Sequence, residues 1–371
     1  MRIGVVTEVV PEERRVALVP ESAGRLIAVK AEVAIQKGAG ASAYFPDSSY
    51  REAGVSILGT SRQVLTSSDL LIKVRPPSSA EVALLRKGSL LVGMLQPLTQ
   101  PELMVQLATR GVTAFSLERL PRISRAQDMD VLSSMSTVSG YHAVLMAAAR
   151  LPRFFPLLMT AAGTVTPARV LVLGAGVAGL QAIATARRLG GVVRAFDVRP
   201  QVKEQVESLG AQFVDVGEPV EAAEGQGGYA AEVSAASQKR EQEALEREVA
   251  EADVVITTAL VPGRPAPVLV TKAAVAKMRP GSVVVDLAAE AGGNCELTQP
   301  GKDIEKGGVW ILGPLDLPSR MANHASQLYS RNVTRFALAL IKEGQLRPDF
   351  DDEVVSATCV THDGRVLVSK S

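Results

Sequence analysis

Residues 169–179 read RVLVLGAGVAG, so a β-prone apolar run leads directly into the pattern Gly-x-Gly-x-x-Gly. Residues 180–186 (LQAIATA) then favour a helix. Gly174 permits a turn that most side chains forbid, Gly176 lets the backbone approach a pyrophosphate, and Gly179 lets the helix lie close to the strand. The N–H groups of the first helical turn would face the phosphates. The segment therefore predicts the strand, turn and helix of a dinucleotide-binding site.

A carboxylate follows at the spacing that this fingerprint requires. The apolar run 192–196 predicts a second strand that ends at Asp197, roughly twenty residues after the glycines. The Asp197 carboxylate can bind both ribose hydroxyls and repels a 2′-phosphate, which favours NAD over NADP. Arg199 argues against strict selectivity, because an arginine near this position can accept a 2′-phosphate. The alternative is an ordinary turn followed by an incidental aspartate.

The composition indicates a soluble protein with two domains. The chain has 371 residues, of which 47% are hydrophobic and 21% charged, and its net charge is +1. Because no basic tract is present, nucleic acid is not an expected partner. Cys295 and Cys359 are far apart in the sequence and predict reduced thiols, without a metal-ligand pattern around either. No signal peptide or apolar window of membrane-spanning length is visible, which predicts a cytoplasmic protein.

Two series of alternating strands and helices predict the fold class. The second series begins at Arg169, after a helical connector at 138–151. The alternation predicts an α/β protein with two Rossmann-like, doubly wound parallel-sheet domains and a cleft between them. The expected strands are 2–6, 31–36, 69–73, 90–94 and 112–116 in the first series, and 169–173, 192–196, 212–214, 253–257, 282–287 and 309–312 in the second.

The domain boundaries follow from where the second series ends. Residues 136–312 would form the NAD-binding Rossmann domain. A helix expected at 333–341 would return the chain to the first domain, which would then be discontinuous and comprise residues 1–135 plus 313–371.

Two regions depart from the alternating pattern. Residues 218–237, which include Tyr229, are rich in Gly, Ala and Glu and would form a mobile loop. A solvated helix would follow at 241–252. Near the end of the chain, residues 356–360 and 365–369 would be strands joined by a hairpin turn.

Two further segments follow strands of the second series, at the edge where doubly wound sheets bind ligands. Residues 257–263 offer small side chains, including Thr258 and Ala259, that would bracket a ribose. Residues 286–294 contain a pair of glycines that lets the backbone approach a ligand. Each segment is equally consistent with a plain tight turn.

A polar stretch at residues 122–134 follows the last strand of the first series. Gln127, Asp130 and Ser133 are three residues apart and would share one face of a helical turn. Arg122 and Arg125 supply cationic donors, and Asp130 and Ser133 can bind a carboxamide. The spacing alone favours the alternative, a solvated loop before a helix.

Together these segments resemble one known family. Over nearly its whole length the chain resembles the soluble NAD(H)-binding component of proton-translocating nicotinamide nucleotide transhydrogenases. One departure is Met135, where the family often carries glutamine. The segments that carry the resemblance are 122–134 (RISRAQDMDVLSS), 174–179 (GAGVAG), 196–200 (FDVRP), 227–230 (GGYA), 257–263 (TTALVPG) and 290–295 (EAGGNC).

The resemblance implies a role for each candidate residue. Arg122, Asp130 and Ser133 would hold the nicotinamide end, and Gln127 would lie between the two nicotinamides at the interface with an NADP(H)-binding component. Tyr229 would lie on a mobile loop that closes on the nucleotide. The other cofactor-binding residues would be Gly174, Gly176 and Gly179 at the pyrophosphate with Ala175 and Val177 beside them, Asp197 at the adenosine ribose with Val198 and Arg199 beside it, and Thr258, Ala259 and Leu260.

The resemblance also implies partners. The chain would form a homodimer and join an NADP(H)-binding component and a membrane-spanning component. It would therefore lie peripherally on the cytoplasmic face of a membrane. Its NAD(H) would exchange hydride directly with NADP(H) on the partner subunit, and the membrane component would couple this transfer to proton movement.

Alanine dehydrogenases are similar over most of the same length and provide the alternative function. In them a lysine, a histidine and an aspartate carry the proton transfers that amine oxidation requires. The matching positions here are Arg75, Gln96 and Glu290. Because arginine stays charged and glutamine does not titrate, these residues favour hydride exchange, which moves no proton at the reacting carbons. A non-catalytic NAD sensor is a third function that the fold would permit.

Overall fold

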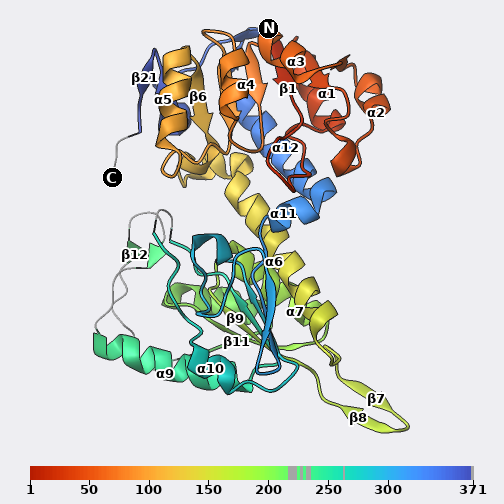
Figure 1. The fold of residues 1–371 in the computed structure, drawn as a ribbon, viewed down its shortest axis with the longest axis vertical. Coiled ribbons are helices and arrows are strands. Elements are labelled where there is room, and N and C mark those ends of the chain that lie inside the picture. The colour runs from red at the N-terminus through yellow and green to blue at the C-terminus, as the bar shows by residue number, and fades with distance from the viewer. Residues whose placement is uncertain (216–223, 226–228, 231–234, 262–263, 369–371) are drawn as a thin grey trace. The chain divides into compact units, whose positions relative to one another are not determined.

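The computed structural model describes residues 1–215, 224–225, 229–230, 235–261 and 264–368. The chain forms two compact units (Figure 1). The first comprises Met1–Met135 and Pro318–Ser371, and the second comprises Ser136–Leu317. The first unit is therefore built from two separate stretches of the chain.

The first unit contains an eight-stranded, mostly parallel sheet. Its central strands are buried along their whole length, as expected for a parallel sheet that is covered on both faces. The strand that returns from the C-terminal stretch is antiparallel to its neighbour. From edge to edge the order is β21 (Arg365–Val366), β20 (Cys359–His362), β6 (Thr113–Ser116), β5 (Leu90–Gly93), β4 (Leu70–Ile72), β1 (Arg2–Val5), β2 (Glu32–Gln36) and β3 (Ser56–Leu58).

Local sequence signals start several helices of this unit. Thr60 and Gln63 form a capping box before α3, and Ser78 and Glu81 form another before α4. Phe336 of α12 lies edge-on against Phe115, with ring centroids 5.6 Å apart, so α12 packs on the sheet. The helices are α1 (Pro20–Ala28), α2 (Asp47–Glu52), α3 (Ser61–Ser67), α4 (Ser79–Leu84), α5 (Pro101–Arg110), α12 (Ala322–Ala339) and α13 (Glu353–Thr358).

The second unit contains a seven-stranded sheet in which all pairs are parallel except the pair at one edge. The strand order reverses between β9 and β14, which is the switch point where doubly wound sheets bind ligands. The order is β11 (Gln212–Phe213), β10 (Val192–Phe196), β9 (Arg169–Leu173), β14 (Val254–Thr257), β15 (Val283–Asp286), β17 (Val309–Leu312) and β16 (Asp303–Lys306). The predicted α/β fold class, with two parallel-dominated sheets, is confirmed.

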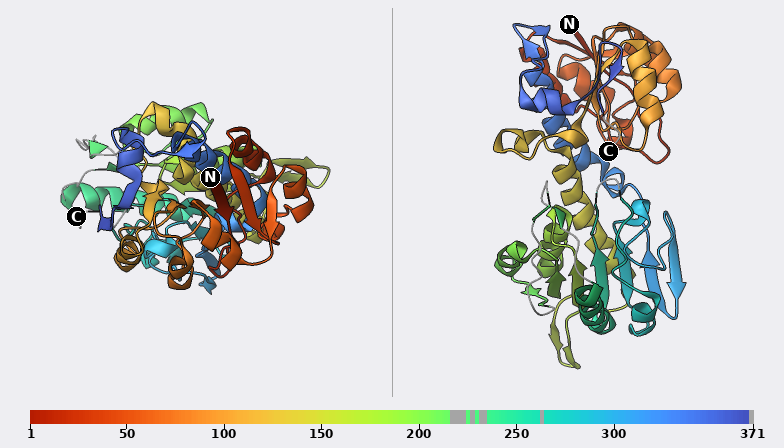
Figure 2. Two further views of the ribbon diagram at one scale, coloured as in Figure 1. Left: turned by 90° about the horizontal axis from the view of Figure 1, so that it is seen from above. Right: turned by 90° about the vertical axis from the view of Figure 1, so that its left-hand side faces the viewer.

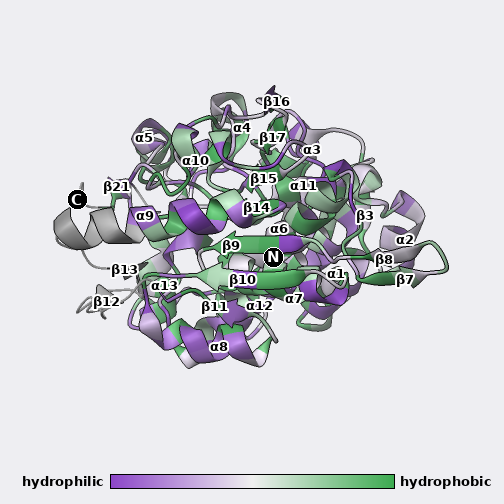
Figure 3. Ribbon diagram, turned by 90° about the horizontal axis from the view of Figure 1, so that it is seen from below, coloured by the Kyte–Doolittle hydropathy of each residue, from purple (hydrophilic) through white to green (hydrophobic). Residues whose placement is uncertain are grey.

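Helices cover both faces of the second sheet (Figure 2). On one face, α6 (Val131–Arg150), α7 (Val177–Arg188) and α8 (Lys203–Ser208) pack on Val170 and Val172. On the other face, α9 (Ala235–Glu251) and α10 (Lys272–Ala276) pack on Leu171 and Leu173. Figure 3 shows β9 and β10 as hydrophobic strands, in line with the burial of alternate side chains on opposite faces.

Short elements complete the described chain. Three small hairpins are β7 (Leu158–Thr160) with β8 (Gly163–Val165), β12 (Glu224–Gly225) with β13 (Tyr229–Ala230), and β18 (Ile341–Lys342) with β19 (Gln345–Leu346). The short helices are α11 (Leu317–Arg320) and the 3-10 helices η1 (Ala41–Ala43), η2 (Leu117–Arg119), η3 (Ser124–Met129), η4 (Pro200–Val202) and η5 (Ala289–Ala291). Within the described residues, no helix is both long enough and apolar enough to cross a membrane.

Each sheet uses an aspartate to set the start of a parallel strand pair. In the first unit Asp69 Oδ2 accepts the N–H of Arg2, the first residue of β1, at 2.8 Å. In the second unit Asp253 Oδ2 accepts the N–H of Arg169, the first residue of β9, at 2.9 Å. Each aspartate stands immediately before the strand that neighbours β1 or β9, so the carboxylate fixes where the parallel pair begins.

The prediction of a strand at 356–360 is wrong. Residues Glu353–Thr358 form α13, and the strand begins only at Cys359. Asp352 accounts for the difference, because Oδ1 of its side chain accepts the N–H groups of Val354 and Val355 and so caps the helix. The hairpin turn predicted between the last two strands does join β20 to β21, but β21 ends at Val366 rather than at residue 369.

Two helices are longer than the sequence predicted. α6 starts at Val131 rather than at 138, and α12 starts at Ala322 rather than at 333. The predicted helix at 241–252 corresponds to α9, which begins earlier in the chain. Most of the predicted mobile loop at 218–237 lies outside the described residues, although β12, β13 and the start of α9 fall within it.

Candidate nucleotide-binding site

The three glycines after β9 meet different demands. Gly174 has φ +98°, and a Cβ there would lie 2.5 Å from Thr258 Oγ1. A Cβ at Gly179 would lie 1.9 Å from the carbonyl oxygen of Gly174, closer than any real contact. Around Gly176, by contrast, a Cβ would meet no atom within 4 Å. Packing therefore requires two of the glycines, whereas the third leaves open space.

This open space lies at the first turn of α7. Gly176 is the N-cap residue, and because it has no side chain the helix begins without a side-chain cap. The first helical residue, Val177, is 43% exposed. The twelve-residue helix therefore presents its first N–H groups and the positive end of its dipole at an accessible position.

Asp197 stands beside this turn at the end of β10. The Gly174 N–H donates to the carbonyl of Phe196 at 2.8 Å, which joins the turn to the strand that leads into the aspartate. Asp197 Oδ2 accepts the Ala175 N–H at 2.7 Å, and Arg199 contacts both carboxylate oxygens. The predicted residues Gly174, Ala175, Asp197 and Arg199 are thus brought together, whereas the Val198 side chain packs against the core.

The segment after β14 closes the other side of the turn. Thr258 Oγ1 donates to the Gly174 carbonyl at 3.0 Å, and the Thr258 N–H donates to the Leu173 carbonyl at 2.8 Å. Ala259 follows, and Leu260 leaves 46% of its surface exposed. Of the predicted segment 258–260, Thr258 therefore contacts the glycine turn directly.

Sequence reasoning missed the residue that fixes this segment. Asn294 is fully buried, and its Oδ1 accepts the Ala259 N–H at 3.0 Å. Its Nδ2 donates to the carbonyls of Ala259 at 2.9 Å and Pro267 at 2.8 Å. A side-chain amide can donate two hydrogen bonds and accept another at the same time, which a hydroxyl with its single proton cannot do. The sequence did offer a signal, an asparagine directly after two glycines, but it gave no indication of which backbone groups this asparagine binds.

The segment at 286–294 begins with an aspartate whose hydrogen bonds hold the fold together. Asp286 is fully buried and accepts from the hydroxyls of Thr257 at 2.9 Å and Thr298 at 2.6 Å. It also accepts the N–H of Cys295 at 3.0 Å. Burial raises the pKa of the Cys295 thiol to about 11, so this thiol stays protonated at neutral pH.

The loop at 122–134 is organised differently from its prediction, and the expectation of one shared helical face is wrong. Gln127 lies in η3, whereas Ser133 lies in the first turn of α6. Between them, Asp130 adopts an extended backbone conformation and caps α6. Its two carboxylate oxygens accept the Ser133 N–H at 2.9 Å and the Ser133 hydroxyl at 2.6 Å.

Residues from the C-terminal stretch hold this loop in place. Arg125 makes a two-pronged ion pair with Asp352, at 2.6 and 3.0 Å. Asn332 of α12 donates to the Asp128 carbonyl at 2.8 Å. Gln127 and Arg122 are exposed. Tyr229 lies in β13, and its side chain falls outside what the structure describes.

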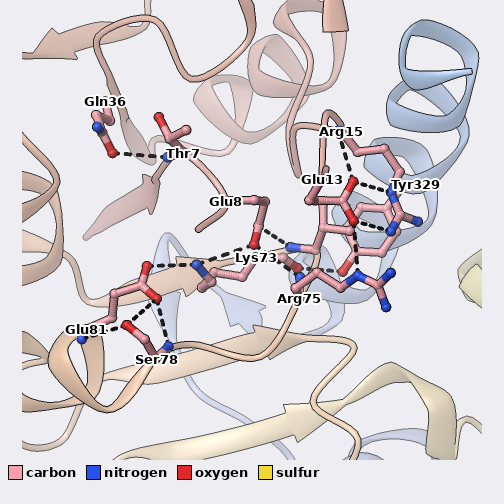
Figure 4. A network of polar contacts seen from close by, with 11 residues as sticks. Thr7, Glu8, Glu13, Arg15, Gln36, Lys73, Arg75, Ser78, Glu81 and Tyr329 are labelled. Atoms are coloured by element: carbon pink, nitrogen blue, oxygen red, sulfur yellow. Dashed lines mark hydrogen bonds and ion pairs between the residues drawn. The ribbon is translucent and has the colours of Figure 1, made fainter. Parts of the chain in front are cut away.

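A buried ionic cluster lies near the carboxyl ends of β1 and β4 in the first unit (Figure 4). Glu13 contacts Nε of Arg15 at 2.7 Å, Nη2 of Arg15 at 2.5 Å and Nε of Arg75 at 3.0 Å. The side chains of Glu13 and Arg15 are 0% and 2% exposed. Burial acts to raise the pKa of Glu13, but the hydrogen bonds and charge of Arg15 prevail and lower it to about 2.

The remainder of this cluster centres on Lys73, which is fully buried. Its Nζ lies 2.8 Å from Glu81 Oε1 and 3.4 Å from Glu8 Oε2, and its carbonyl accepts from the Tyr329 hydroxyl at 2.6 Å. Burial raises the pKa of Glu8 despite the nearby Lys73 charge. Within the described residues, no group of three or more His, Cys, Asp and Glu is arranged to hold a metal ion.

Comparison with known proteins gives matches along the whole chain. The domains described as "Alanine dehydrogenase/PNT" match at residues 4–139 (N-terminal domain) and 143–369 (C-terminal domain). A Rhodospirillum rubrum protein named as the first portion of NAD(P) transhydrogenase subunit alpha is 48% identical, over 99% of this chain and 98% of that protein.

Two solved structures are similar to the chain over nearly its whole length, one of a transhydrogenase and one of an alanine dehydrogenase. The crystal structure of transhydrogenase from Sinorhizobium meliloti is 42% identical, covers 99% of both chains and superposes with a TM-score of 0.87. An L-alanine dehydrogenase structure is 29% identical, covers 99% of this chain and 97% of that one, and superposes with a TM-score of 0.83.

Proposed function

The chain belongs to the alanine dehydrogenase/PNT family, and we propose that it is the NAD(H)-binding component of a NAD(P) transhydrogenase. The observation that carries the proposal is the uncapped first turn of α7 beside Asp197. The open space at Gly176 admits a pyrophosphate, and the carboxylate faces the same turn. The chain is also 48% identical to a transhydrogenase subunit but only 29% identical to the L-alanine dehydrogenase of known structure.

Each portion of the coenzyme has residues suited to it. The N–H groups of the first turn of α7 bind the pyrophosphate, and Asp197 binds the adenosine ribose. Val177 and Leu260, both apolar and half exposed, flank the nucleotide. Arg122, Asp130 and Ser133 hold the nicotinamide end, and Tyr229 of β13 acts on the nucleotide from the segment at 218–237. When bound, NAD(H) supplies the hydride donor or acceptor.

The activity requires partners. In this proposal Gln127 faces NADP(H) held by a second component, since its side chain is exposed on a loop that Asp352 and Asn332 fix in place. The chain forms a homodimer and lies peripherally on the cytoplasmic face of a membrane, through a membrane-spanning component that couples hydride transfer to proton movement.

The rival function is amino acid oxidation by an alanine dehydrogenase. That reaction requires a titratable group at the reacting centre. Of the three positions matched to alanine dehydrogenases, one holds Gln96, which does not titrate, and one holds Arg75, whose guanidinium contacts Glu13. Only the third keeps a carboxylate, Glu290, so the lysine and the histidine of that reaction both lack a counterpart.

A single pair of assays separates the two functions. The chain is mixed with an NADP(H)-binding transhydrogenase component, and reduction of an NAD analogue by NADPH is followed. The chain alone is assayed in parallel with alanine and NAD. We expect hydride transfer only in the mixture; brisk oxidation of alanine by the chain alone would refute the proposal.

The purified chain should bind NADH more tightly than NADPH, by at least about tenfold, because Asp197 repels a 2′-phosphate. Titration calorimetry with each reduced nucleotide measures both dissociation constants. Equal affinities would remove Asp197 from the ribose-binding role while leaving the pyrophosphate site in place.

Gln127→Asn should leave NADH binding within about twofold of the wild-type value, yet slow hydride transfer to the partner's nucleotide by about tenfold or more. The shortened side chain no longer reaches the partner's nucleotide, and misplacement by about 1 Å is enough for such a loss. Stopped-flow hydride transfer is compared with NADH titration of the same protein. If the variant instead loses NADH binding, Gln127 belongs to the NAD(H) site itself.

A further inference from the structure

The carboxylate of Asp197 is already fully occupied by donors from the protein. Oδ1 accepts the Arg199 N–H and Arg199 Nε, each at 2.9 Å. Oδ2 accepts the Ala175 N–H at 2.7 Å and Arg199 Nη2 at 3.0 Å. A carboxylate offers about four lone-pair positions, and four donors fill them here. A ribose diol that donates to Asp197 must therefore displace some of these donors.

The two kinds of donor differ in how easily they leave. The Ala175 N–H is fixed, because the neighbouring Gly174 N–H is bonded to Phe196 at the junction of two paired strands. The Arg199 guanidinium is held by a flexible side chain that is 23% exposed, whereas the Asp197 side chain is 6% exposed. The guanidinium can therefore leave Asp197 and be solvated by water, whereas the backbone donors stay where the strands hold them.

We infer that Arg199 is an internal competitor for the ribose position, which NAD(H) displaces from Asp197 when it binds. The inference rests on the proposed function, since it takes Asp197 as the ribose ligand. The ribose hydroxyls replace Nε and Nη2 of Arg199, while the Ala175 and Arg199 N–H groups stay in place and keep the carboxylate oriented. Arg199 thus lowers the affinity for NAD(H) and speeds its release.

The displaced guanidinium also affects nucleotide selectivity. Once it leaves Asp197 it stays within a side-chain length of the ribose, where its charge favours a 2′-phosphate that Asp197 repels. Arg199 therefore narrows the preference for NADH over NADPH. Removing it should strengthen NADH binding and widen that preference together, which a residue that merely contacted the nucleotide would not do.

The test compares NADH dissociation constants of the wild type with those of Arg199→Met, Asp197→Asn and the double variant. Methionine keeps an unbranched side chain but donates no hydrogen bond. We expect Arg199→Met to bind NADH about three- to tenfold more tightly, the size expected for losing one partly exposed ion-pair competitor. Asp197→Asn should bind more weakly, and Arg199→Met should give no gain in that background.

Arg188→Met is the matched control, since it removes the same charge from the exposed last turn of α7, away from Asp197. It should leave NADH affinity unchanged. If Arg199→Met proves unstable by thermal melting, Arg199→Gln takes its place. NADH binding that is unchanged or weaker in Arg199→Met, with Asp197→Asn still impaired, overturns the competitor role alone. Wild-type affinity in Asp197→Asn instead overturns the proposed ribose site.

Discussion

Replacing Gly179 by alanine should destabilise the second unit by about 3 kcal/mol, at the upper end of what overpacking costs. The added Cβ would lie 1.9 Å from the Gly174 carbonyl oxygen, which is backbone and cannot rotate away. α7 would have to move off β9, and the turn between them would open. Thermal melting should show a loss of about 6–12 °C for a unit of this size, and NADH binding should fall with it.

Gly176→Ala is the matched control, because the same methyl group enters open space there. Gly176 has φ −76° and ψ −169°, a conformation that alanine adopts freely. Its melting temperature should stay close to that of the wild type, yet NADH affinity should fall by about tenfold or more, since the methyl group occupies the approach of the pyrophosphate. A wild-type melting temperature for Gly179→Ala, or wild-type NADH affinity for Gly176→Ala, would contradict this division of roles.

The glycine turn was predictable because its requirements are local. The turn itself requires Gly174, which has φ +98°, and the Gly174 carbonyl requires Gly179, whereas the close approach of Thr258 to Gly174 is remote in sequence. Gly176 follows from the spacing of the fingerprint. The two βα series were predictable for the same reason, since apolar runs of strand length recur between helical segments. The fold class therefore followed from short-range patterns alone.

The contacts that position the residues of the candidate site were not predictable. Their partners either lie far away in the sequence or cannot be identified from residue type. Asp352 caps α13 and also holds Arg125, which is 227 residues away. Asn294 positions Ala259 across a gap of 35 residues. Arg199 suggested a 2′-phosphate ligand from its type alone, whereas its geometry shows a guanidinium bound to Asp197. The type of a residue shows which groups it is able to bind, but the folded structure is needed to show which group it does bind.

The second large effect is expected at Glu13, whose replacement by glutamine should destabilise the protein by about 3–5 kcal/mol, as for other broken buried ion pairs. Glutamine preserves the shape but removes the carboxylate that faces the buried charge of Arg15 and the partly exposed charge of Arg75. Chemical denaturation at pH 7 measures the loss. Glu32→Gln, which removes an exposed ion pair with Arg2, should cost about 1 kcal/mol or less.

The pH dependence gives an independent check on the same group. The pKa of Glu13 is lowered to about 2 in the folded protein, against about 4.3 for an unfolded glutamate. Its contribution is therefore fully present above about pH 4.3 and is lost as the pH falls through 2. The difference in stability between wild type and Glu13→Gln should shrink over that window by about 3 kcal/mol, because carboxylates remote from this cluster titrate alike in both proteins. Glu8 is the exception, since burial and the Glu13 charge both raise its pKa. A difference that stays constant from pH 5 to pH 2 would show that Glu13 does not hold these two arginines as an ionised group.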